Sequence, residues 1–325
     1  MLGGTVLTSV KCKVLYKGSL IPLGLVAWAL LTLRADGEPI GSGTLRPPFQ
    51  ELQPCKQVAG GARAFSHMDN PQWAAAHQAI VQQVQADKQR GVELVFYGDS
   101  ITESWRGTGM GRKVPQWADI PKVFAKHYGN LRASVYAIGG DTVGNLLWRV
   151  RNGEGLQGLD PKAVWVLIGT NDLGLQPDLA DAAAVAANIS TGVSAVVNAL
   201  LEQAPKTTVL LLELLPRGDP AAQPFPPYYA QPSVFTAAID ATNRCLQAYA
   251  ALHERVDFVS CGHVFLQKLQ GSGAEVLVKM PDGLHPNAEG MELLAQCLKP
   301  HLEEAGIDPS RQRLSSLVSR AAAFG

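Results

Sequence analysis

The chain has 325 residues, of which 46% are hydrophobic and 17% charged, and its 28 basic and 28 acidic side chains cancel to a formal charge of zero. This length could make one large α/β domain or two small ones, and it is ample for a sizeable hydrophobic core. The composition excludes collagen, coiled coil and low-complexity disorder. The zero net charge means that the chain lacks the excess of basic residues typical of nucleic-acid-binding proteins, so we expect no nucleic-acid partner.

The first 35 residues predict a targeting segment. They hold four basic and no acidic side chains, and a short apolar stretch runs from Leu20 to Leu33 before a small residue, Ala35. This pattern is typical of a secretory signal peptide, whereas a membrane span needs about 20 apolar residues. We therefore expect residues 1–35 to be a signal peptide and the protein to be secreted or in the secretory pathway. The alternatives are an uncleaved signal anchor, an organellar transit peptide or a cytoplasmic chain. We expect no other segment to be long and apolar enough to span a bilayer.

Cysteine usage is compatible with an oxidising compartment. Removal of the leader would leave four of the five cysteines, a number that allows disulfides, although buried free thiols are an equal alternative and the spacing does not give the pairing. No C-x-x-C pattern occurs, and we expect no metal site. A glycosylation sequon begins at Asn188, in a predicted helix. The cysteines are Cys12, Cys55, Cys245, Cys261 and Cys297.

After a Gly- and Pro-rich linker at 36–65, helical and strand patterns alternate along residues 66–305, and a surface tail follows at 306–325. Asn70 and Pro71 predict the start of a first helix that ends at Gly91. Short apolar runs separated by helical patterns predict a doubly wound parallel sheet with helices on both faces, a three-layer α/β/α sandwich. The predicted strands are 92–97, 134–138, 163–168, 207–212 and 256–259, and the later helices are near 116–128, 142–151, 181–203, 234–253 and 288–304.

A Gly-Asp-Ser tripeptide at 98–100 directly follows the first predicted strand. A serine at a strand-to-helix turn can project its hydroxyl above the sheet edge, where the first N–H groups of the helix suit a developing oxyanion. Ordinary turns use the same residues, so the tripeptide alone is weak. A nucleophilic Ser100 also needs a base.

Among the seven histidines, only His285 lies in a suggestive context, just before the last predicted helix. Asp282 is three residues upstream, so a tight turn can bring its carboxylate to one imidazole nitrogen while the other faces a serine. This is the orienting role of the acid in a Ser-His-Asp triad. The alternative is a loop histidine that caps the following helix.

Small polar clusters follow two more predicted strands, at 139–142 (Gly-Gly-Asp-Thr) and 169–172 (Gly-Thr-Asn-Asp). A glycine N–H and an asparagine amide are donor types that build an oxyanion hole. Each cluster could also be an ordinary turn and helix cap. Three strands that end in such clusters at one sheet edge together favour a functional site.

Residues 98–100, Gly140, 169–172 and 282–286 (Asp-Gly-Leu-His-Pro) resemble, in order, the four sequence blocks of the SGNH (GDSL-type) hydrolases, a likeness that covers roughly residues 90–303. Longer stretches, at 139–142 with 147–149 (Leu-Trp-Arg), 152–154 (Asn-Gly-Glu) and 214–218 (Leu-Leu-Pro-Arg-Gly), are similar to the catalytic subunits of platelet-activating-factor acetylhydrolase IB. The resemblance implies a flavodoxin-like fold with the hydrolase domain at 66–305. It also implies an esterase that needs neither metal nor organic cofactor.

The same resemblance implies residue roles: Ser100 as nucleophile, His285 as base and Asp282 as its orienter. The oxyanion hole would comprise the N–H groups of Ser100 and Gly140 and the side chain of Asn171. Short acyl groups, acetyl above all, are expected on a small-molecule or polysaccharide ester, and a homodimer is possible by the same likeness.

Several departures from that branch leave the substrate open. The chain has a leader, an added Gly-rich segment at 107–111 and an expanded Pro-rich loop at 216–232. A secreted carbohydrate acetylesterase is therefore an alternative. A non-catalytic binding protein on the same fold is another, although every expected catalytic position is filled.

Overall fold

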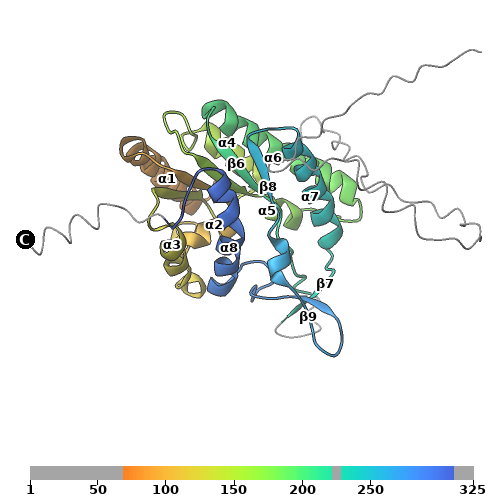
Figure 1. The fold of residues 1–325 in the computed structure, drawn as a ribbon. Helices are drawn as coiled ribbons and strands as arrows, with labels where there is room; N and C mark the ends of the chain where they lie inside the picture. The colour runs from red at the N-terminus through yellow and green to blue at the C-terminus, as the bar shows by residue number, and fades with distance from the viewer. Residues whose placement is uncertain (1–68, 222–227, 311–325) are drawn as a thin grey trace, which may run out of the picture. The chain divides into compact units, whose positions relative to one another are not determined.

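The computed structural model describes residues 69–221 and 228–310 (Figure 1). The predicted leader at 1–35 and linker at 36–65 lie outside the described residues. The predicted tail is described only as far as Ser310.

Five parallel strands form the central sheet in the order β4-β1-β5-β6-β8. In chain order this is 2-1-3-4-5, the order of flavodoxin-like doubly wound sheets, so the predicted fold class is confirmed. Most of the strands are largely apolar because helices cover both faces of the sheet, whereas the edge strand β8 contains Asp257. Their bounds are β1 (Leu94–Gly98), β4 (Ala133–Ala137), β5 (Ala163–Leu167), β6 (Thr208–Leu212) and β8 (Val256–Val259).

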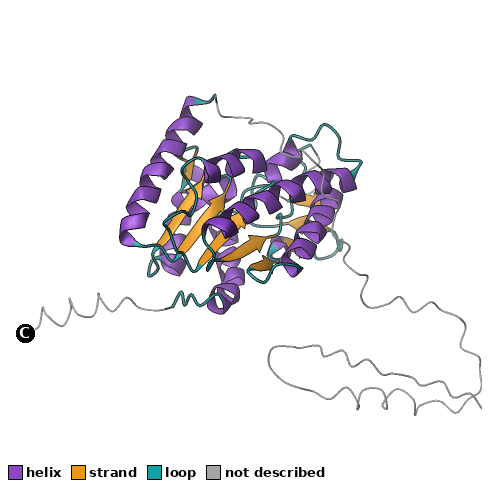
Figure 2. Cartoon of the chain, turned by 90° about the horizontal axis from the view of Figure 1, so that it is seen from above, coloured by secondary structure: helices purple, strands orange, loops and turns teal. Residues whose placement is uncertain are grey.

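Alternate side chains of β1 enter two separate hydrophobic cores. Val95 and Tyr97 pack in the core under one helical layer, and Leu94 and Phe96 pack in the core under the other. Figures 1 and 2 show the strands between these two layers. The first layer comprises α1 (Pro71–Arg90), α4 (Val143–Arg151), α6 (Ala182–Gln203) and α7 (Thr236–Ala251), and the second α2 (Ser100–Glu103), α3 (Ile120–Tyr128) and α8 (Ala288–Glu304).

The predicted boundaries of α1 are confirmed. The Asn70 side chain accepts a hydrogen bond from the Gln72 N–H at 2.8 Å, Pro71 occupies the first turn, and Gly91 ends the helix at φ 73°. One expectation needs correction: α6 is long and apolar enough to cross a membrane. Because 67% of its most apolar 18-residue stretch is buried inside the fold, we interpret α6 as a core helix of this domain.

Short strands and turns were not predicted, because segments of two or three residues carry no recognisable period. An antiparallel sheet, β7-β10-β9, includes the end of the Pro-rich loop, and a hairpin, β2-β3, occupies the Gly-rich segment. The bounds are β2 (Thr108–Gly109), β3 (Arg112–Lys113), β7 (Tyr229–Gln231), β9 (Leu266–Lys268) and β10 (Glu275–Leu277), with 3₁₀ turns at Ser104–Arg106, Pro115–Trp117 and Gly262–Phe265 and a short helix α5 (Thr170–Gly174).

A disulfide joins Cys261, just after β8, to Cys297 on α8. Cys245 on α7 is also disulfide-bonded. The structure therefore favours disulfides over buried free thiols at these three cysteines.

Candidate active site

Three predicted site residues follow the carboxyl ends of three adjacent strands. Ser100 follows β1, Gly140 follows β4 and Asn171 follows β5. In the strand order β4-β1-β5, the chain leaves β1 in opposite directions for its two neighbours, and ligands of open α/β sheets bind at this switch point.

Ser100 is the first residue of α2, so its N–H has no acceptor within the helix. Asp99 caps the helix by accepting the Ile101 N–H at 3.0 Å. Before it, Gly98 leaves no room for a side chain, because a Cβ there would lie 2.2 Å from the Thr102 hydroxyl oxygen and 2.5 Å from the Leu167 carbonyl oxygen. Strand and helix therefore meet in a sharp turn that presents the serine.

A chain of hydrogen bonds joins Ser100, His285 and Asp282. The Ser100 Oγ lies 2.8 Å from Nε2 of His285, and Nδ1 of the same ring lies 2.6 Å from Oδ2 of Asp282. Oδ1 of Asp282 accepts the backbone N–H groups of Leu284 at 2.9 Å and His285 at 2.7 Å. The tight turn that the three-residue spacing suggested is therefore present, and it fixes the carboxylate against the imidazole.

Electrostatics favour an ionised Asp282. Burial alone would raise the pKa of this carboxyl group, but the hydrogen bonds from the His285 ring and from the two backbone N–H groups outweigh it and lower the pKa to about 2. A negative charge beside Nδ1 stabilises an imidazolium, which forms whenever Nε2 takes a proton from a neighbouring hydroxyl.

The other two expected donors lie directly after β4 and β5. Gly140 has φ 82°, a backbone conformation that side chains disfavour. The Asn171 side-chain amide donates to the backbone carbonyl of Asp141 at 2.8 Å, which fixes the plane of the amide. An amide nitrogen carries two protons, and the second one has no acceptor within the part of the chain that the structure describes, so it can donate to a ligand.

A sequence model of the GDSL-like lipase/acylhydrolase family matches residues 96–293. The chain belongs to this family. It is accordingly a carboxylic ester hydrolase, as predicted.

Individual relatives of this GDSL-type hydrolase align with different fractions of its sequence. The platelet-activating factor acetylhydrolase IB subunit alpha2 of Gallus gallus is 30% identical over 147 residues, which is 45% of this chain and 53% of that protein. The subunit alpha1 of Homo sapiens is 26% identical over 274 residues, 84% of this chain and 90% of that protein. The match to the chicken subunit thus spans about half of that relative's length.

Solved structures with similarity to the chain include a GDSL-like lipase from Bacteroides thetaiotaomicron, with a TM-score of 0.46 and 24% identity over 72% of this chain and 96% of that one. An acetylxylan esterase from Geobacillus stearothermophilus has a TM-score of 0.45 and 21% identity over 69% of this chain and 98% of that one.

Glu103 is a site residue of this hydrolase that sequence reasoning missed. Its carboxylate is fully buried and accepts four hydrogen bonds, from Thr108 Oγ1 at 2.7 Å and from the N–H groups of Met110 at 2.8 Å, Gly111 at 2.8 Å and Gly139 at 2.6 Å. It therefore joins three parts: the helix that begins at the serine, the hairpin β2-β3 and the loop of Gly140. A carboxylate three residues after the serine, followed by a Gly-rich segment, was the available signal.

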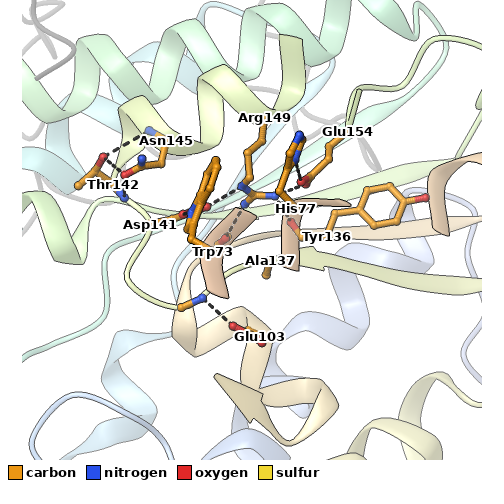
Figure 3. Close-up of polar contacts among 12 residues, drawn as sticks. Trp73, His77, Glu103, Tyr136, Ala137, Asp141, Thr142, Asn145, Arg149 and Glu154 are labelled. Atoms are coloured by element: carbon orange, nitrogen blue, oxygen red, sulfur yellow. Dashed lines mark hydrogen bonds and ion pairs between the residues drawn. The ribbon is translucent and has the colours of Figure 1, made fainter. Parts of the chain in front are cut away.

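A buried ion cluster braces the same strand ends (Figure 3). The Arg149 guanidinium is fully buried and donates to Asp141 Oδ2 at 2.6 Å, to Glu154 and to the carbonyls of Gly98 at 3.2 Å and Tyr136 at 3.3 Å. Burial disfavours the charge, but the two carboxylates outweigh it and raise the pKa of Arg149. The end of β1, β4 and the loop after β4 are thus tied to one cation.

Two side chains of α1 complete the cluster on its outer side. Trp73 Nε1 donates to the remaining Asp141 oxygen at 2.6 Å, and His77 Nδ1 lies 2.6 Å from Glu154 Oε1. Figure 3 shows both side chains beside Arg149. The sequence comparison had singled out 147–149 and 152–154 as similar to relatives, but it assigned them no role.

The Pro-rich loop packs against the turn that holds His285. The Gly218 N–H donates to the Gly283 carbonyl at 2.7 Å, and a Cβ at either glycine would lie within about 3 Å of the Tyr229 ring. This part of the expanded loop therefore supports the site from outside.

The carboxyl group of Asp99, next to the serine, has a raised pKa. It is fully buried, and one carboxylate oxygen has no partner among the described residues. Burial raises the pKa of Asp99 to about 7, although its bond from the Ile101 N–H opposes that shift. The residue therefore titrates near neutral pH beside the proposed nucleophile.

Proposed function

We propose that this hydrolase is a serine esterase that removes short acyl groups, acetyl above all, with Ser100 as nucleophile, His285 as general base and Asp282 as the residue that orients the base. The observation that carries the proposal is the unbroken chain of hydrogen bonds from the Ser100 hydroxyl through the His285 ring to Asp282.

In the acylation step, Ser100 Oγ forms a bond to the ester carbonyl carbon while its proton passes to Nε2 of His285. The imidazolium is stabilised by the adjacent ionised Asp282. When the tetrahedral intermediate collapses, the bond between carbon and alcohol oxygen breaks, and the Nε2 proton moves to that oxygen. The alcohol leaves, and Ser100 remains acylated.

In the deacylation step, water takes the place of the alcohol. His285 accepts a proton from the water as its oxygen bonds to the acyl carbon, and then returns the proton to Ser100 Oγ as the acyl bond breaks. The products are a carboxylic acid and free enzyme, so the base is regenerated in each cycle.

The negative oxygen of both tetrahedral intermediates needs hydrogen-bond donors. We assign this role to the N–H groups of Ser100 and Gly140 and the free proton of the Asn171 amide. Removal of one such donor costs about 10²–10³ in kcat in serine hydrolases. The ion cluster around Arg149 holds the end of β1 and the loop after β4, which carry the Ser100 and Gly140 donors, and Asn171 is tied to that loop by its bond to the Asp141 carbonyl.

An acetyl group is proposed because the curated relatives are acetylhydrolase subunits. The proposal is tested by kcat/KM for a series of p-nitrophenyl esters from acetyl to octanoyl, which should fall as the acyl chain lengthens. Ser100→Ala and His285→Ala should each reduce hydrolysis to near background while the fold persists. Ser194→Ala, a buried serine on α6, is the matched control and should retain activity. Native activity in Ser100→Ala would exclude Ser100 as the nucleophile, and no activity in the wild type would favour a binding protein on the same fold.

We also propose that the protein enters the secretory pathway. The disulfide between Cys261 and Cys297 supports this, because disulfides are rare in reducing compartments. Mass spectrometry of the extracellular protein should find a mature terminus near Asp36. An intact Met1 terminus in a soluble cytosolic form would contradict the proposal.

A further inference from the structure

A groove of about 370 Å³ opens beside His285. One wall is the turn that carries the proposed base, with Pro281 and Pro286, and the other is formed by Val114, Gln116 and Trp117. The surface of the groove is mostly apolar. Its volume lies within the range of small-molecule sites.

The second wall belongs to the segment that the hairpin β2-β3 introduces between α2 and α3. The Trp117 N–H donates to the Val114 carbonyl at 3.0 Å. The indole ring packs so closely on the hairpin that a Cβ at Gly109 would lie 3.2 Å from it. The bonds from Met110 and Gly111 to Glu103 anchor the hairpin in turn. Trp117 is therefore held in place before any ligand arrives.

The indole ring of Trp117 also lies against the proposed base. Its centroid is 5.1 Å from the centroid of the His285 ring, at an interplanar angle of 52°. The side chain is half-buried, so part of the ring faces the groove. A ligand group that reaches the groove would contact this aromatic surface.

Reaction geometry identifies the part of an ester that would reach it. The carbonyl oxygen points to the donors at Ser100, Gly140 and Asn171, whereas the alcohol oxygen must come within hydrogen-bond reach of Nε2 of His285 to receive the proton. The groove is lined by His285 and by none of the other three residues. It therefore lies on the alcohol side of the reacting carbon.

We propose that this groove binds the alcohol portion of the ester and that Trp117 makes the enzyme prefer ring-shaped alcohols over linear ones. The inference rests on the proposed esterase function and adds a substrate class to it. A flat apolar wall gains large contact area with a rigid ring, and a rigid ring loses little conformational freedom on binding. An apolar cavity of about 150 Å³ already accommodates benzene in a protein core, so this groove has room for a substituted ring.

The test compares kcat/KM for cyclohexyl acetate and hexan-2-yl acetate, which share the acyl group, the carbon number and a secondary leaving alcohol, so that they differ in whether that alcohol is a ring or an open chain. The wild type should prefer the cyclohexyl ester. Trp117→Ala should reduce that preference about threefold to tenfold, as expected for the loss of one aromatic contact, and Trp117→Phe should keep most of it. Because the ratio is measured in one preparation, the folded fraction cancels. Leu252→Ala, an exposed residue at the end of α7, is the control and should leave the ratio unchanged.

Each other outcome is informative. If Trp117→Ala hydrolyses both esters with an unchanged ratio, the alcohol assignment is wrong while the esterase function stands. A change in acyl-length preference instead would place the acyl chain in the groove, which also overturns the inference. If the wild type shows no Ser100-dependent hydrolysis of either ester, the proposed function itself fails. Should Trp117→Ala not fold, Val114→Ala, which shortens the other apolar side chain of that wall, should lower the ratio, and an unchanged ratio there would overturn the inference.

Discussion

Replacement of Glu103 by Gln should lower stability and turnover together. Oε1 accepts Thr108 Oγ1 and the Gly111 N–H, and Oε2 accepts the N–H groups of Met110 and Gly139. A glutamine amide keeps one accepting oxygen, so two of the four donors would face an NH₂ group in a fully buried position. If the NH₂ group takes the place of Oε1, the Thr108 hydroxyl can accept from it, whereas the Gly111 N–H is left without an acceptor. An unsatisfied buried donor costs about 1–3 kcal/mol, so the free energy of unfolding should fall by about that amount.

Turnover should fall because Gly139 immediately precedes the proposed oxyanion donor Gly140. Once its anchor is lost, the loop can shift, and a misplacement of about 1 Å near a reacting centre can cost about 10² in rate. We therefore expect kcat of the folded Glu103→Gln protein to fall by about tenfold to 10²-fold, less than the loss after outright removal of a donor.

The assay combines urea denaturation with active-site titration, so that kcat is expressed per labelled enzyme. Glu202→Gln, an exposed glutamate at the end of α6, is the matched control and should behave like the wild type. If Glu103→Gln unfolds within about 0.5 kcal/mol of the wild type and keeps native kcat, Glu103 does not hold the loop and the reasoning is refuted.

Three further predictions concern the oxyanion donor, the residue before the serine and the disulfide. Asn171→Ala should lower kcat about 10²–10³-fold with little change in KM. Asn171→Asp should be at least as damaging because a carboxylate repels the oxyanion, and near-native kcat in this variant would contradict the three-donor arrangement. The pKa of Asp99 is raised from 3.8 to about 7 in the folded state, so the stability contributed by its neutral form is lost as pH rises through about 7. Urea denaturation between pH 4.5 and 7.5 should therefore show a shallower loss of stability in Asp99→Asn than in the wild type, and parallel profiles would refute the shift. Replacing Cys261 and Cys297 together with Ser should cost about 3–4 kcal/mol, the loop-closure value for a sequence separation of 36, and an unchanged urea midpoint would argue against the bond.

The sheet and the three residues of the hydrogen-bonded chain could be predicted because their signals are local in the sequence. Strands β1, β5 and β6 are largely apolar runs, and β1, β4 and β5 are each followed by a polar cluster. The turn from Asp282 to His285 spans only three residues. The approach of Ser100 to His285 follows from the sheet topology, once both are placed at the carboxyl edge.

The supporting residues could not be predicted because their partners come from distant segments. Arg149 forms ion pairs with Asp141 and Glu154, and each of these carboxylates also bonds to a side chain of α1, which lies far earlier in the sequence. No spacing rule links these positions. Similarly, Trp117 reads as an ordinary aromatic residue until the hairpin places it against His285. Such contacts depend on how distant segments pack against each other. The hydrophobic periodicity of a single sequence predicts helices and strands, but it does not predict these contacts.

The central claim is that Ser100 is the nucleophile, and covalent labelling tests it most directly. The wild-type protein is treated with a fluorophosphonate, and the adduct is mapped by peptide mass spectrometry. We predict a single adduct on Ser100, no labelling in Ser100→Ala and strongly slowed labelling in His285→Ala, since nucleophile and base act as a unit. An adduct on a different serine, with ester hydrolysis retained in Ser100→Ala, would contradict the account.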